Sequence, residues 1–142
     1  ATSGAVTSGI DRLEHCSLAL PEQLDRIREL NIAVCTQPSF LTHRLPKYLS
    51  ELSSAEHRWL WPLASLVERG IEVTLSSDSP VVPANPKQWI EASINRPLGS
   101  NEAVSEELAK HMAAVSAITP GLPAGMLVIA NDFGYRPVIG RD

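Results

Sequence analysis

Apolar and polar positions in the first part of the chain follow strand spacing, then helical spacing, then strand spacing again. Residues 10–15 mix apolar and polar side chains in a strand-like way, and residues 32–36 form a short, β-branched, mostly apolar run typical of a buried strand. Between them the sequence predicts an amphipathic helix over residues 21–31, from apolar residues at helical spacing: Leu24, Ile27 and Leu30. Strand, helix and strand at this distance form a βαβ unit, so the pattern predicts a parallel sheet.

The next segment contains helix signals that are interrupted. Residues 38–53 have no periodicity and are predicted to be a long loop. Ser53 and Glu56 have the spacing of a capping box, which predicts that a helix begins directly after Ser53. Pro62 falls inside the apolar pattern that follows, so we expect a kink or two short helices, and Gly70 ends the pattern.

The remainder of the chain predicts one more strand of the sheet and a helical region. Residues 71–75 alternate as a third strand and lead into the polar turn 76–80. Helices are predicted at about 86–95 and 102–117, and one further strand at 126–130. The fold class is therefore α/β. We expect a structured region over residues 10–118, a linker or disordered segment over 1–9, and a tail rich in Gly and Pro over 119–142.

Composition and charge exclude several classes of protein. The 142 residues carry a net charge of −4 with scattered basic side chains, whereas a nucleic-acid-binding protein would present a basic patch. Apolar runs are only a few residues long, and residues 1–9 have no signal-peptide pattern, so we expect no membrane span and no secretory signal. Cys16 and Cys35 form no disulfide framework and no zinc-binding pair, which is typical of a reducing compartment. We therefore predict a cytoplasmic protein whose partner is a small-molecule substrate.

Candidate chemistry lies at the predicted strand ends, since ligands of parallel α/β proteins bind at the carboxyl ends of the strands. This rule selects residues 14–16, 36–38 and 76–80. His15 could ligate a metal ion, and Asp78 could both ligate metal and transfer protons. By residue type alone, His15 could equally be a structural histidine and Asp78 a turn-forming residue.

Other residue types give weaker signals. Cys16 follows His15 in a predicted extended strand, so its side chain should point to the opposite face and be buried and inert. Three further histidines show no paired ligand spacing: His43, His57 and His111. A solvated loop position is the expected state of His43, with a substrate contact as the alternative.

The motifs together resemble one family. They are Arg12-Leu13-Glu14-His15-Cys16, Val34-Cys35-Thr36-Gln37-Pro38, Trp61-Pro62-Leu63 and Ser77-Asp78-Ser79-Pro80-Val81, with Arg96 after the following helix. Over about residues 10–98 the chain resembles the carboxyl-terminal half of an amidohydrolase-superfamily barrel, in the amidohydrolase-3 branch of metal-dependent hydrolases. The resemblance implies that the three predicted strands are the sixth, seventh and eighth of a (β/α)₈ barrel.

The resemblance also implies roles for individual residues. His15 matches the metal-binding histidine at the end of strand six. Asp78 matches the strand-eight aspartate that contacts metal and acts as general acid and base. Gln37 and Arg96 match recurrent positions of the branch and are the candidate substrate-binding residues.

The implied activity is metal-dependent hydrolysis of an amide-like or other C–N bond. Family members carry further ligands on strands one, four and five, and this sequence contains none of those segments. The expected cofactor of the complete enzyme is therefore a divalent metal ion, with zinc as the expected metal. For this chain alone, the alternative expectation is that it binds no metal. We expect the chain either to associate with itself or to pair with a missing N-terminal half of the barrel. The alternative function is that of a non-catalytic, truncated α/β domain or an interaction module.

Overall fold

A three-stranded parallel sheet lies at the centre of the protein. The computed structural model describes residues 11–114, 127–131 and 134–139. The strands β1 (Arg12–Glu14), β2 (Ala33–Thr36) and β3 (Val73–Leu75) are hydrogen-bonded in the order β1-β2-β3. Both strand pairs are parallel, so the predicted α/β class with a parallel sheet is confirmed.

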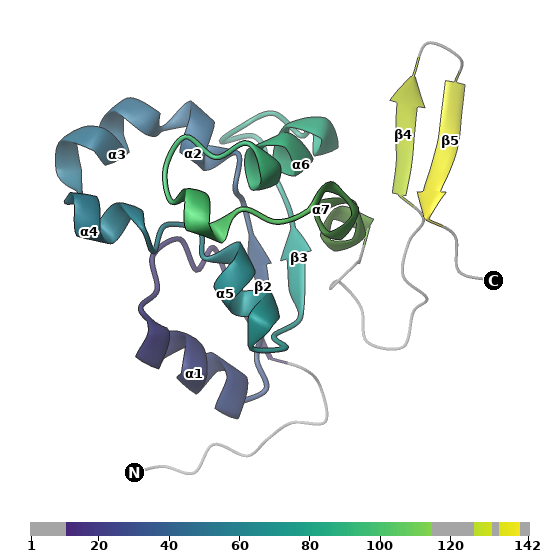
Figure 1. Ribbon diagram of the computed structural model, residues 1–142. Coiled ribbons are helices and arrows are strands. Elements are labelled where there is room, and N and C mark those ends of the chain that lie inside the picture. The colour runs from purple at the N-terminus through teal and green to yellow at the C-terminus, as the bar shows by residue number, and fades with distance from the viewer. Residues whose placement is uncertain (1–10, 115–126, 132–133, 140–142) are drawn as a thin grey trace.

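Helices cover one face of this sheet. They are α1 (Pro21–Glu29), α5 (Leu63–Glu68) and α7 (Glu106–Ala114), and Figure 1 shows α5 in front of β2 and α7 beside β3. The core between sheet and helices is formed by buried apolar side chains from each element: Leu24, Ile27, Val34, Leu63, Leu66, Val73, Leu75 and Met112. The opposite face carries Glu14, Cys35 and Thr74, which are in register. Apolar burial therefore stabilises the helix-covered face, whereas the other face combines the buried residues Cys35 and Thr74 with the exposed Glu14.

Short helices gather beyond the carboxyl ends of the strands (Figure 1). Here the prediction of a loop over residues 38–53 is wrong, because this segment contains α2 (Phe40–His43) and α3 (Leu45–Glu51). Helices of four and seven residues are too short to form from local preference alone. They are stabilised by a second apolar core, in which the Phe40 and Trp61 rings stack with centroids 5.7 Å apart.

The capping signals in the middle of the chain are confirmed. The Ser53 amide donates to Glu56 Oε2 at 2.8 Å, and Ser53 Oγ accepts from the Glu56 amide, at the start of α4 (Ser54–His57). Pro62 is the N-cap of α5, so the helical pattern is interrupted there as predicted and forms two short helices, α4 and α5. Gly70 follows with φ of 68°, the left-handed conformation in which glycine commonly terminates a helix.

The carboxyl-terminal elements agree with the prediction in part. The helix predicted at 86–95 is α6 (Pro86–Ile94), whereas the one predicted at 102–117 is η1 (Ser100–Glu102) followed by α7. The strand predicted at 126–130 is β4 (Leu127–Asn131), and it pairs in antiparallel fashion with an unexpected strand, β5 (Gly134–Ile139).

The predicted linker and part of the predicted tail cannot be compared with the structure, whereas the expectation of no membrane span can be. Residues 1–9, predicted to be a linker or disordered, lie outside the described residues, as do residues 115–126 of the predicted tail boundary. None of the helices in the described ranges is long and apolar enough to cross a membrane.

Candidate functional site

Side chains from all three strand ends are joined by hydrogen bonds. His15, directly after β1, has its Nδ1 2.8 Å from Gln37 Oε1, and Gln37 follows β2. Gln37 Nε2 donates to Ser76 Oγ at 2.8 Å, directly after β3. The structure therefore joins the three segments selected by the strand-end rule through side-chain hydrogen bonds. We call these contacts the contact chain His15–Gln37–Ser76.

These contacts determine which ring nitrogen of His15 is available. The Cys35 carbonyl oxygen can only accept a hydrogen bond, and the Gln37 atom facing it at 3.4 Å is therefore the amide nitrogen. The amide oxygen of Gln37 consequently faces His15, and it requires a proton on Nδ1. The remaining nitrogen, Nε2, has no hydrogen-bond partner among the described residues, and the residue is exposed. This is the arrangement in which a second residue orients a metal-binding histidine.

The backbone at His15 is held in an unusual conformation. His15 has φ of 68° and Cys16 has φ of 47°, both in the left-handed region that non-glycine residues rarely adopt. The His15 amide donates to the Cys35 carbonyl at 2.8 Å, and Thr36 Oγ1 donates to the His15 carbonyl at 2.7 Å. These two bonds offset the backbone strain and fix the position from which the imidazole leaves the sheet.

Asp78 lies in the turn after β3, also with a left-handed backbone at φ of 60°. The Val81 amide donates to the Asp78 carbonyl at 2.9 Å, and the side chain that supports the turn is Ser77, whose Oγ accepts from the Ser79 amide at 3.0 Å. Among the described residues, the Asp78 carboxylate has no hydrogen-bond or ion-pair partner, and it is exposed. The turn is therefore built without the Asp78 side chain.

His15 and Asp78 follow the two strands that flank β2, so their strand ends are about 10 Å apart at ordinary strand spacing. An imidazole nitrogen and a carboxylate are suitable donors for a divalent metal ion. Within the described ranges, no group of three or more His, Cys, Asp or Glu side chains could hold a metal ion. The two residues therefore fit part of a metal site, which in catalytic proteins has about three protein ligands.

Gln37 and Arg96, the candidate substrate-binding residues, both make contacts within the protein. Gln37 is only 2% exposed, its amide nitrogen donates to Ser76 Oγ and the Cys35 carbonyl, and its amide oxygen faces His15 Nδ1. It therefore positions His15. Substrate binding by Gln37 stays a prediction.

Arg96 joins two loops beyond the strand ends. Its Nε donates to the Gly99 carbonyl at 2.8 Å and its Nη2 to the Leu60 carbonyl at 2.5 Å. Burial lowers the pKa of the Arg96 guanidinium to about 10, against an opposing attraction from Glu102. Gly99 has φ of 59°, and a Cβ there would lie 2.7 Å from the His57 carbonyl, so only glycine fits. These contacts are structural, and substrate binding by Arg96 stays a prediction.

Cys16 is half-buried, whereas the sequence predicts a buried and inert cysteine on the opposite face from His15. Strand β1 ends at Glu14, so residues 15 and 16 are not extended and do not alternate between faces. The Cys16 side chain instead turns back against the apolar core. Burial raises the pKa of the Cys16 thiol to about 11, which keeps it protonated at neutral pH.

Two residues that hold the site, Thr36 and Ser76, lie in the segments that the strand-end rule selects, but the sequence assigned neither of them a role. Thr36 fixes the His15 carbonyl, and Ser76 accepts from both Gln37 Nε2 and Cys35 Sγ, the latter at 3.4 Å. Thr36 is the last residue of β2, and Ser76 directly follows the last residue of β3. A search for hydroxyl side chains at strand ends would have found both.

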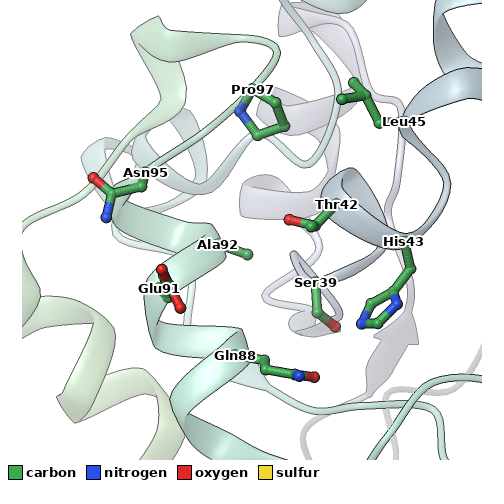
Figure 2. A pocket seen from close by; sticks show the side chains of 9 residues that line it. All are labelled: Ser39, Thr42, His43, Leu45, Gln88, Glu91, Ala92, Asn95 and Pro97. Carbon is green, nitrogen blue, oxygen red and sulfur yellow. The ribbon is translucent and has the colours of Figure 1, made fainter.

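A cavity of about 410 Å³ lies beside these strand ends, between α2 and α6 (Figure 2). Ser39, Thr42 and His43 line one side, and Gln88 and Ala92 of α6 line the other. His43 is the last residue of α2 and exposed, and so lies in a helix instead of the predicted loop.

Comparison with known proteins gives consistent matches. The model of the amidohydrolase family matches residues 3–127. “Putative amidohydrolase YtcJ” of Bacillus subtilis (strain 168) is 27% identical over 86 residues, which are 61% of this chain and 16% of that protein.

Two solved structures are similar to the chain. An uncharacterized metal-dependent hydrolase from Pyrococcus furiosus is 33% identical with a TM-score of 0.63, over 71% of this chain and 21% of that one. An uncharacterized metal-dependent hydrolase from Pyrococcus horikoshii OT3 is 27% identical with a TM-score of 0.65, over 71% and 22%. The chain thus spans about a fifth of the length of these relatives.

Proposed function

The chain belongs to the amidohydrolase family, in its amidohydrolase-3 group, and from this premise we propose that it forms the carboxyl-terminal part of a metal-dependent hydrolase site. The site would cleave an amide-like or other C–N bond. In this proposal β1, β2 and β3 are the sixth, seventh and eighth strands of a (β/α)₈ barrel. Their parallel order and the alignment of candidate residues at one end of the sheet support it.

The observation that carries the proposal is the contact chain His15–Gln37–Ser76. His15 donates from Nδ1 to Gln37, and its Nε2 has no hydrogen-bond partner among the described residues. His15 would hold a divalent ion through Nε2, with Asp78 as a second ligand. Such an ion, zinc by expectation, supplies Lewis acidity that lowers the pKa of water.

Asp78 would act as the general acid and base. Its carboxylate is exposed and has no partner among the described residues, so it is free to accept a proton from water at the start of the reaction. The same oxygen would then donate that proton to the leaving nitrogen. Gln37 and Thr36 take no part in proton transfer and hold His15 in place.

The test compares the 142-residue chain with a polypeptide in which five further β/α units precede it. Because two ligands are too few for a catalytic site, the chain alone should retain little zinc after dialysis and show no turnover of N-acyl amino acids. The longer polypeptide should retain zinc and hydrolyse at least one member of an amide panel. Stoichiometric zinc and turnover by the chain alone, or a zinc-loaded longer polypeptide inert towards every amide, would each contradict the proposal.

The second candidate is a non-catalytic interaction module, favoured by the exposure of β1. Leu13 of β1 is 39% exposed, and β1 is the first strand in the order β1-β2-β3, at the edge of the part of the sheet that the structure describes. Under this alternative the chain associates with itself or with a separate half-barrel. Light scattering should then show dimers or larger species, and a monomer at all concentrations would oppose it.

A further inference from the structure

We draw no further inference here: the strongest candidate, the cavity between α2 and α6 in which Ser39 Oγ and Gln88 Oε1 are buried without a partner among the described residues, is lined by segments that follow the carboxyl ends of β2 and β3, and it therefore belongs to the candidate site already described.

Discussion

The ends of β1 and β3 make an instructive comparison, because each places a candidate residue on a left-handed backbone. At the end of β1, His15 is held at three points: its ring, its amide and its carbonyl each have a partner. At the end of β3, only the backbone of Asp78 is held, and its carboxylate has no partner within the described ranges. A metal ligand benefits from a fixed lone pair, whereas a proton carrier must reach two different atoms during a reaction. Under the proposed function, the difference would therefore distinguish a ligand with a fixed orientation, His15, from a residue that also transfers protons, Asp78.

The strongest test of this comparison is Asp78→Asn in the longer polypeptide. Asn keeps the shape and tolerates the left-handed backbone, but it cannot accept and return a proton. General acid and base catalysis contributes about 10²–10⁴-fold, so kcat should fall by that order with little change in KM. Steady-state kinetics, with the parent enzyme and the variant at equal zinc content, measures both kcat and KM.

Ser77→Ala is the control for the turn. It removes the hydrogen bond that Ser77 Oγ accepts from the Ser79 amide and leaves the carboxylate of Asp78 in place. If the turn alone matters, Ser77→Ala should lower kcat as much as Asp78→Asn does. An Asp78→Asn enzyme with near-normal kcat would refute the proton-transfer role.

His15→Ala should act through metal occupancy instead of proton transfer. Removing the imidazole deletes one ligand, so zinc should dissociate more readily and excess zinc should restore part of the activity. Because Ala is itself unfavourable at φ of 68°, His15→Asn provides a second variant that tolerates this backbone. Activity measured against zinc concentration checks the prediction. Loss of kcat that no zinc concentration relieves would count against His15 as a ligand.

Gln37→Leu should give a smaller effect of the same kind. It leaves Nδ1 of His15 without its acceptor, and loss of such a supporting contact costs about 10- to 100-fold in metal affinity. Gln37→Glu keeps an oxygen facing Nδ1 and should retain most of the affinity. Zinc competition with a chelator measures both variants. If Gln37 binds substrate instead, Gln37→Leu will raise KM at an unchanged zinc affinity.

Cys16 should produce the smallest effect. Cys16→Ala removes a packed thiol that touches no proposed reacting group, so turnover should be nearly unchanged. In the parent chain, the raised pKa of about 11 keeps the thiol neutral at pH 9, where an ordinary cysteine is substantially ionised. Its alkylation, followed by peptide mass spectrometry, should stay slow at pH 9 and accelerate as the pH approaches 11. Burial of the neutral thiol stabilises the fold fully below pH 9, and this contribution is lost as the pH rises towards 11. Rapid alkylation at pH 8 would contradict the packed position.

Local signals in the sequence predicted those parts of the fold that local chemistry determines. The capping box of Ser53 and Glu56, the interruption at Pro62 and the apolar spacing of residues 21–31 all depend on near neighbours, and the structure agrees. The helices over residues 40–51 were not predictable in this way. They depend on the stacking of Phe40 on Trp61, 21 positions away, which no window of local sequence contains.

The sequence predicted where the candidate site residues lie, but it did not predict the hydrogen bonds between them. The strand-end rule located His15, Gln37 and Ser76 because parallel strands bring their carboxyl ends to one edge. The left-handed backbone of His15 and the orientation of its ring depend on Thr36 and Gln37, which are more than 20 positions away. The sequence also gave no indication that Ser77, and not Asp78, supports the turn.

The central position of β2 determines how long the arrangement at His15 persists. The Ala33 and Val34 amides donate to Asp11 and Glu72 on opposite sides, so amide exchange in β2 requires the sheet itself to open. The His15 amide is bonded to Cys35 of this same strand. We therefore expect its exchange with solvent deuterium to require separation of β1 from β2, although its side chain is exposed. In kinetic terms, we expect the lifetime of the His15 backbone geometry to follow the pairing of β1 with β2 and not the motion of a surface loop.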